Sequence, residues 1–346
     1  MDLDAMTATA RELVAPGKGI LAADESTPTM AKRMAAVGLS STEPLRRAYR
    51  ELLLTTDGLA EHISGVILFD ETVRQRHRSG TPFPELLGRR GMLPGIKVDR
   101  GTRPLAGCPG EVATEGLDGL RERLAEYAAL GLRFAKWRAV LRIADGLPTD
   151  TAVETNAHAL ARYAALAQEA GLVPIVEPEV LMDGDHDLAT CAAVTERVLR
   201  EVYRQLSRHG VALEATLLKP NMVLPGTDSV APVSDRQVAE TTMAVLRRVV
   251  PAAVPGIVFL SGGQNEQQAT ARLDALNRVT PAQPWQLSFS FGRALQAPVL
   301  RLWASEVNGP AAPAQAALLK RARLNGAARQ GAYSHGLEAH EAALTT

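Results

Sequence analysis

Short apolar runs alternate with helical patterns along most of the chain. Eight of the runs have the length and composition of buried strands, and polar or turn residues follow each of them. These runs lie at residues 19–26, 66–70, 94–99, 134–140, 173–179, 213–219, 257–263 and 286–293. Apolar residues at the spacing of one helix face occur at residues 117–128, 153–164, 199–206, 238–249 and 269–276, and another helix begins near Thr29.

Strands that alternate with helices predict a parallel sheet, because each helix carries the chain back to the start of the next strand. Eight such units closing on themselves form a (β/α)8 barrel, the TIM barrel fold. No linker divides the chain, so we expect one α/β domain over residues 1–346. An N-terminal helix within residues 1–17 is ended by Pro16-Gly17. Residues 310–346 are rich in alanine and then in glycine and polar residues, which predicts a C-terminal helix and a mobile tail.

The composition excludes several classes of function. Lys and Arg number 38, as do Asp and Glu, so the net charge is zero and no general field attracts nucleic acid or an anionic membrane. No apolar run reaches the roughly 20 residues of a membrane-spanning helix. The two cysteines, Cys108 and Cys191, are too few for a disulfide framework, and no secretory signal starts the chain. We therefore expect a cytoplasmic protein without nucleic-acid or membrane partners.

Charged and hydroxyl residues lie within or directly after the predicted strands. They are Asp24, Lys97, Lys136, Arg138, Glu177, Glu179, Lys219, Ser261 and Arg293. In a barrel, such positions meet at the C-terminal face, where barrel active sites lie. One acid at a strand end needs no function, but so many buried charges are costly unless they pair or line a site. The pattern therefore indicates an active site at this face.

Lys219 is the candidate nucleophile. It follows the apolar pair Leu217-Leu218 and precedes Pro220, which places its amine at the mouth of a pocket. Burial disfavours the ammonium form and lowers a lysine pKa, and a neutral lysine can attack a ketone to form a Schiff base. A second cation nearby, Lys136, would lower the pKa further. The alternative is a strand-end lysine that only extends to solvent.

Two neighbouring strands each carry a pair of charged residues of one sign. Lys136 and Arg138 are two residues apart and point to the same side of their strand, as do Glu177 and Glu179 on the next strand. The four side chains either form ion pairs with one another or take part in the chemistry of the site. The sequence leaves both interpretations open.

Two separate groups of residues are candidate anion sites. Ser261-Gly262-Gly263 follows the seventh strand and Arg293 follows the eighth, where barrels often bind phosphate through free backbone N–H groups. The second group comprises Lys97, Ser26, Thr29 and Arg33. Cations at two well-separated places indicate a substrate with two phosphates.

The acidic loop at residues 183–187 (DGDHD) raises the question of a metal. It lacks the glycine at the sixth position and the glutamate at the twelfth that an EF-hand loop uses, and no HxH or HExxH pairing occurs in the chain. Isolated acidic loops are usually solvated turns. We therefore expect neither a metal nor a cofactor.

Seven stretches, in order from residue 19 to residue 295, resemble class I fructose-bisphosphate aldolase. They are GILAADEST, GIKVDRG, FAKWRAVL, PIVEPEVLMDGDHDL, LEATLLKPNMV, FLSGGQ and SFSFGRAL. The resemblance implies a Schiff-base-forming TIM barrel, usually a homotetramer, that needs no metal and acts on sugar phosphates. It implies reversible cleavage of fructose 1,6-bisphosphate to dihydroxyacetone phosphate and glyceraldehyde 3-phosphate.

The resemblance also implies roles for individual residues. Lys219 in LLKPNM would form the Schiff base, Glu177 in VEPE would transfer protons with Glu179 beside it, and Asp24 in LAADES would lie near the scissile bond. The supporting cations would be Lys136 and Arg138. The 1-phosphate region would comprise Ser261, Gly262, Gly263, Ser290, Gly292 and Arg293, and the 6-phosphate region Ser26, Thr29, Arg33 and Lys97. How the three carboxylates divide acid and base roles stays open.

The chain departs from the family pattern at several positions. Ala215 and Arg100 stand where the family usually has Gly and Lys, and Pro28-Thr29 stands where Gly and Ser are common. Many members end in a tyrosine that helps proton transfer, whereas the last tyrosine here is Tyr333. The substrate preference therefore stays open between fructose 1,6-bisphosphate, fructose 1-phosphate and sedoheptulose bisphosphate. A non-catalytic sugar-phosphate binder is the alternative from another class.

Overall fold

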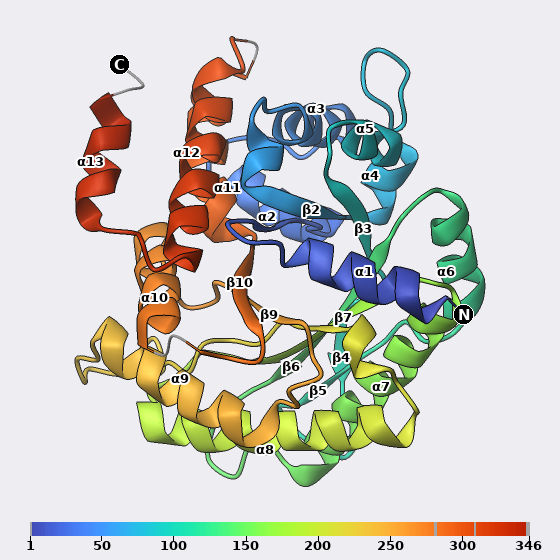
Figure 1. The fold of residues 1–346 in the computed structure, drawn as a ribbon, viewed down its shortest axis with the longest axis vertical. Coiled ribbons are helices and arrows are strands. Elements are labelled where there is room, and N and C mark those ends of the chain that lie inside the picture. The colour runs from blue at the N-terminus through green and yellow to red at the C-terminus, as the bar shows by residue number, and fades with distance from the viewer. Residues whose placement is uncertain (1, 280–281, 308, 344–346) are drawn as a thin grey trace.

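Eight parallel strands close into a barrel, as the sequence predicts (Figure 1). The computed structural model describes residues 2–279, 282–307 and 309–343. Neighbouring strands follow the order β1-β10-β9-β8-β7-β6-β3-β2. Their bounds are β1 Gly19–Ala23, β2 Ile63–Leu68, β3 Leu93–Lys97, β6 Phe134–Leu141, β7 Val173–Val180, β8 Leu217–Leu218, β9 Gly256–Phe259 and β10 Gln286–Phe291. The (β/α)8 fold is therefore confirmed.

Helices separate the strands and surround the barrel (Figure 1). Those up to strand β6 are α1 Leu3–Leu13, α2 Thr27–Ala35, α3 Glu43–Leu54, α4 Asp70–Arg74, α5 Phe83–Arg89 and α6 Leu120–Ala129. Those after β6 are α7 Asp150–Glu169, α8 Leu188–Arg208, α9 Asp235–Val249, α10 Glu266–Val279, α11 Arg293–Ser305, α12 Ala312–Arg329 and α13 His335–Ala343. Among the described residues, none of these helices is long and apolar enough to cross a membrane.

The C-terminal region differs from the prediction of one helix and a mobile tail. After α12 the chain turns and forms a second helix, α13, which lies beside α12 in Figure 1. The carboxylate of Glu338 in α13 accepts hydrogen bonds from the buried guanidinium of Arg321 and from the hydroxyl of Tyr333. A buried arginine needs a partner of opposite charge, and the ion pair between Arg321 and Glu338 holds α13 beside α12. Tyr333 therefore lies on the outside of the barrel.

A short antiparallel hairpin, β4 Thr102–Pro104 and β5 Val112–Thr114, is a second feature that periodicity does not predict. Its strands have three residues each, too few for an alternation to be recognised. The buried carboxylate of Glu111 accepts from the backbone N–H and the hydroxyl of Thr149. Asn156 donates to the carbonyl of Val112. These bonds hold the hairpin against the N-terminal half of α7.

The inside of the barrel is apolar towards the N-terminal ends of the strands. Helix α1 lies across this end and packs its apolar face against the strand residues (Figure 1). The cluster comprises Met6, Ala10 and Leu13 of α1 and Val14, the residue that caps it, with Ile20, Ala22, Ile67, Phe134, Val173, Ile175, Ala215, Leu217 and Val258. The barrel is thus filled and closed at one end, and only its C-terminal end can hold a site.

The inner packing can be tested at Gly95, which lies opposite Phe134 in the register of β3 and β6. A Cβ atom on Gly95 would lie 2.3 Å from the Phe134 ring. We expect Gly95→Ala to lower the free energy of unfolding by about 1–3 kcal/mol, the usual cost of overpacking, as measured by urea denaturation. Gly88→Ala is the control, because nothing lies within 4 Å of its Cβ position in helix α5. That variant should be neutral or more stable by up to about 1 kcal/mol, and an equal loss in both variants would contradict the packing argument.

Candidate active site

The inward-facing residues of the strands are apolar at the closed end of the barrel and charged at the other end. On β7, Ile175 belongs to the inner cluster and Glu177 and Glu179 follow at alternate positions. On β6, the residues after Phe134 at the same spacing are Lys136 and Arg138. Alternate residues of a strand face the same side. The strand period therefore directs these charged side chains into the open end of the barrel.

Lys219 reaches the site in the same way from β8. Leu217 belongs to the inner cluster, and Lys219 lies two residues further along. Its backbone N–H donates to the carbonyl of Val176 on β7 at 2.8 Å, which continues the pairing of the two strands. The amine is therefore presented from a fixed backbone beside Glu177.

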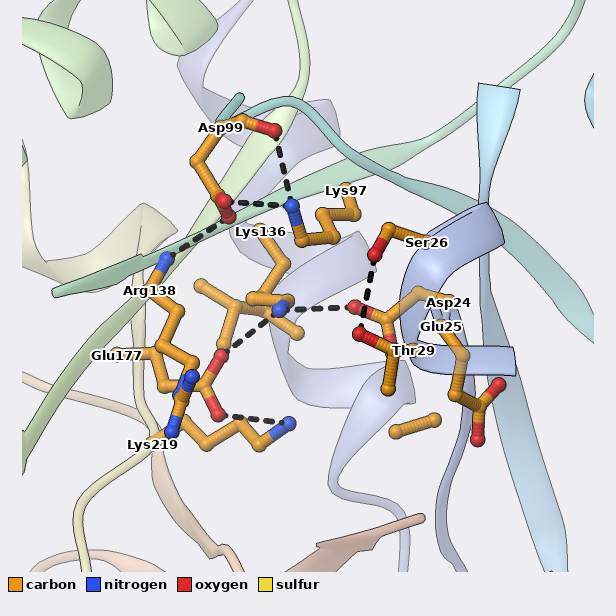
Figure 2. A network of polar contacts seen from close by, with 12 residues as sticks. Asp24, Glu25, Ser26, Thr29, Lys97, Asp99, Lys136, Arg138, Glu177 and Lys219 are labelled. Atoms are coloured by element: carbon orange, nitrogen blue, oxygen red, sulfur yellow. Dashed lines mark hydrogen bonds and ion pairs between the residues drawn. The ribbon is translucent and has the colours of Figure 1, made fainter. Parts of the chain in front are cut away.

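Three buried side chains and the partly buried Asp24 form one line of alternating charge (Figure 2). The Nζ atom of Lys136 lies 2.8 Å from Oδ2 of Asp24 and 3.0 Å from Oε2 of Glu177. The other oxygen of Glu177, Oε1, lies 3.1 Å from Nζ of Lys219. Glu177 thus bridges the two amines, so each positive charge has a carboxylate directly beside it.

The charge on each member depends on its neighbours. Burial acts to raise the pKa of Asp24, but Lys136 and Lys219 outweigh it and lower that pKa. Burial likewise opposes ionisation of Glu177, whose pKa is lowered by the same two lysines and by Arg138. Burial disfavours the charge on Lys136, yet Asp24 and Glu177 raise its pKa. The structure therefore favours two ionised carboxylates around a permanently charged Lys136.

A second set of ion pairs lies alongside. Nε of Arg138 contacts Oε2 of Glu179, and the backbone N–H of Arg138 donates to Oδ2 of Asp99 at 3.2 Å. Asp99 also accepts from Nζ of Lys97 (Figure 2). Glu179 is thus bound to a guanidinium, whereas Glu177 contacts both lysines. Asp99 was not identified from the sequence, although its position two residues after Lys97, the last residue of β3, was a usable signal.

The predicted 1-phosphate residues come from two adjacent loops, because β9 pairs with β10. Gly263 has a positive φ of 73°, and a Cβ atom there would lie 2.7 Å from Cγ of Met182, so a side chain would be strained as well as crowded. Gly292 directly precedes helix α11, whose first residue is the exposed Arg293. Ser290 is buried, and its hydroxyl has no hydrogen-bond partner among the described residues. Backbone N–H groups at the start of α11 and a free hydroxyl suit a phosphate.

The other predicted anion group is only partly brought together. Oγ of Ser26 and Oγ1 of Thr29 lie 3.0 Å apart at the start of α2. Ser26 and Lys97 line one cavity of about 630 Å³, which also contains Arg100. Arg33 lies elsewhere. It pairs with Glu25, and its Nη2 lies 3.9 Å from the Cβ position of Gly292.

The acidic loop at residues 183–187 has a structural use. Asp187 caps helix α8 by accepting from the backbone N–H of Thr190 at 2.8 Å. The carbonyl of His186 accepts from Gly226 N–H, which joins the loop to the segment after β8. No group of three or more His, Cys, Asp or Glu side chains within the described ranges is placed to hold a metal ion.

Comparison with known proteins places this geometry in a family. The family model described as glycolytic, fructose-bisphosphate aldolase class-I, matches residues 5–345. The chain is 55% identical to a probable fructose-bisphosphate aldolase class 1 of Xylella fastidiosa over 331 residues, covering 96% of this chain and 99% of that protein. The chain belongs to the class I fructose-bisphosphate aldolase family.

Relatives from eukaryotes extend the match. This aldolase is 55% identical to the cytosolic fructose-bisphosphate aldolase 6 of Arabidopsis thaliana, covering 95% of this chain and 92% of that one. A solved structure of the aldolase of Plasmodium falciparum, in complex with TRAP and a small-molecule inhibitor, superposes with a TM-score of 0.94. The two chains are 47% identical, and the match covers 96% of each. The enzyme is therefore a carbon–carbon lyase of class I, and the family expected from the sequence is confirmed.

The charge arrangement of this aldolase predicts a specific pH dependence. The lowered pKa of Asp24 means that the folded state binds fewer protons than the unfolded state. Its contribution to stability is therefore present above the unfolded pKa and is lost as pH falls below about 4. Between pH 6 and pH 3.5, the wild type should lose more unfolding free energy in urea titrations than Asp24→Asn does.

The exposed Asp118 provides the control for this comparison. Asp118→Asn should follow the pH dependence of the wild type, because its carboxylate lies outside the buried network. Parallel curves for the wild type and Asp24→Asn would show that Asp24 is not held ionised by the two lysines.

Proposed function

We propose that this aldolase cleaves fructose 1,6-bisphosphate reversibly to dihydroxyacetone phosphate and glyceraldehyde 3-phosphate through a Schiff base on Lys219. The contact between Nζ of Lys219 and Glu177 at 3.1 Å carries the proposal, because a nucleophilic amine needs a proton-transfer group beside it. Lys136 and Asp24 complete the set at the open end of the barrel. The family match favours this enzyme over a non-catalytic sugar-phosphate binder.

The first half of the reaction uses the Lys219–Glu177 pair. The deprotonated amine of Lys219 attacks C2 of the ketose, and a carbinolamine forms. Protonation of the C2 hydroxyl lets water leave, and the product is an iminium ion. Glu177 is adjacent to the amine and can take its proton and return one to the leaving hydroxyl. The iminium then serves as the electron sink for the next step.

The second half breaks the C3–C4 bond. A carboxylate removes the proton of the C4 hydroxyl, the carbonyl of glyceraldehyde 3-phosphate forms, and the electron pair passes to the iminium as an enamine. Asp24 is the base we propose, because Lys136 keeps it ionised. The enamine is then protonated at C3, and hydrolysis releases dihydroxyacetone phosphate. Glu179, paired with Arg138, has a supporting role in this scheme.

The two anion regions support a bisphosphate as the substrate. One lies at the loops after β9 and β10, and the other contains Ser26, Thr29 and Lys97. Because fructose 1-phosphate would leave the second region empty, its kcat/KM should be lower. Paired kinetics with sedoheptulose bisphosphate decide between the two bisphosphates.

We also propose that the enzyme is a cytoplasmic homotetramer. The cytosolic names of its plant relatives and the family membership support this assignment. Light scattering coupled to size-exclusion chromatography measures the mass directly, and a monomeric mass at working concentration would contradict the tetramer.

Borohydride reduction in the presence of dihydroxyacetone phosphate tests the Schiff base. We expect the trapped label on Lys219, located by peptide mass spectrometry, and no trapping in Lys219→Met or Lys219→Arg. Met keeps a similar length without the amine, and Arg keeps the charge but is not a nucleophile at neutral pH. Lys136→Met should still be trapped, but more slowly, because Lys136 acts through the field around Glu177. Label on Lys97 or Lys136 in the wild type, with Lys219 unmodified, would contradict the mechanism.

Arg293 tests the phosphate assignment. Arg293→Ala should weaken binding of the bisphosphate by about 1.5–3 kcal/mol, the size of a lost charged hydrogen bond, and the Michaelis constant measures this. Arg301→Ala on the same helix is the control, because Arg301 pairs with Glu266. An unchanged Michaelis constant in Arg293→Ala would rule out this role.

A further inference from the structure

Glu25 is a buried carboxylate that the reaction scheme does not use. It directly follows Asp24 at the end of β1, but its side chain extends away from the Lys136–Glu177 group (Figure 2). Only 8% of the residue is exposed. The two residues that follow β1 therefore point in opposite directions. Asp24 faces the inside of the barrel, and Glu25 faces the surrounding helices.

Three helices converge on the carboxylate of Glu25. Oε1 accepts from the guanidinium of Arg33 in α2 and from Nε2 of Gln296 in α11, the latter at 2.9 Å. Oε2 accepts from Nη2 of Arg50 in α3 at 2.7 Å. Nε2 of Gln296 also donates to the carbonyl of Ala22 in β1 at 2.7 Å. Glu25 thus fixes α2, α3 and α11 relative to the end of β1.

The cluster has one negative and two positive charges. The side chain of Arg50 is 4% exposed, and its Nη1 has no hydrogen-bond partner among the described residues. The side chain of Arg33 is 26% exposed, so it is the member of the pair that can reach a ligand. The surplus positive charge is therefore available to an anion on the side of Arg33.

The position of Arg33 indicates which phosphate of the substrate it can bind. Its Nη2 lies 3.9 Å from the Cβ position of Gly292, the residue before helix α11. Gln296, which also binds Glu25, lies in the first turn of that helix. The carboxylate therefore holds both a cation and a helix N-terminus at the loop assigned to the 1-phosphate. Lys97 and Ser26 line the other anion region.

We propose that Glu25 is a positioning residue that, together with Arg50, presents Arg33 to the phosphate carried by the dihydroxyacetone portion of the substrate. This inference rests on the proposed function and specifies it further. It transfers Arg33 from the 6-phosphate group to the 1-phosphate group. The ligand is the phosphate monoester of a triose or ketose, bound between Arg33 and the start of α11.

The reverse reaction, the condensation of the two trioses, tests the two phosphate regions separately, because each triose carries one phosphate. Glu25→Gln should raise the Michaelis constant for dihydroxyacetone phosphate by roughly tenfold to a hundredfold, as expected when a charged hydrogen bond no longer orients Arg33. The Michaelis constant for glyceraldehyde 3-phosphate should stay within about threefold of the wild type. A rise confined to glyceraldehyde 3-phosphate, or equal changes for both trioses, would overturn the assignment.

A double variant separates positioning from stability. Glu25→Gln leaves the buried guanidinium of Arg50 and the partly exposed one of Arg33 without a carboxylate, so it also lowers the thermal midpoint. Adding Arg50→Gln restores the original net charge of the cluster, and the midpoint should recover. The Michaelis constant for dihydroxyacetone phosphate should stay raised, because Arg33 still lacks its carboxylate. Recovery of that constant along with the midpoint would show that Glu25 only neutralises Arg50 and would overturn the proposal.

Glu71→Gln is the matched control. Glu71 in α4 binds Arg46 through both carboxylate oxygens, and Arg46 lies on α3, the helix that also carries Arg50. Its kinetic constants should equal those of the wild type, and a selective loss for dihydroxyacetone phosphate in this variant would overturn the specific role of Glu25. Trapping of the wild type at Lys219 tests the proposed function separately from these comparisons.

Discussion

A buried charge is stable only beside an opposite charge, and this constraint organises the open end of the barrel. Asp24, Lys136, Glu177 and Lys219 alternate in sign, and Glu177 contacts both amines. Removing Lys136 leaves Asp24 without its partner, and removing Glu177 leaves Lys219 without its partner. The site must therefore be built as a unit, and the rigid strands of the barrel supply the positions. The substrate enters a field that already exists, so little reorganisation is needed during the reaction.

The apolar half of the barrel is what makes this arrangement possible. Helix α1 and the ring of Phe134 fill the closed end, and the charged side chains of the site lie at the other end. The same strand period that buries Ile175 presents Glu177 two residues later. Outside the barrel, Glu25 repeats the principle with Arg33 and Arg50. Stability and catalysis thus depend on alternate positions of the same strands.

Sequence reasoning was strongest where a side chain follows directly from a strand. Apolar runs predict the eight strands and the position of Lys219 at a strand end. The alternation of side chains along a strand predicts that Lys136 and Glu177 point into the barrel. Hairpin β4–β5 and helix α13 were missed because short strands and small amphipathic helices have weak patterns. Arg33 was assigned by motif order, but its guanidinium lies near Gly292 because Glu25 holds it there. Such long-range ion pairs have no local signal in the sequence.

We propose that the amine of Lys219, beside Glu177, is the reacting group and that the 1-phosphate binds at the start of α11. A crystal structure of the borohydride-reduced adduct with dihydroxyacetone phosphate measures both features at once. We predict a covalent bond from Nζ of Lys219 to C2 and a phosphate held between the Ser261–Gly263 loop and the N-terminus of α11. An adduct on another lysine, or a phosphate bound beside Lys97 and Ser26, would contradict it.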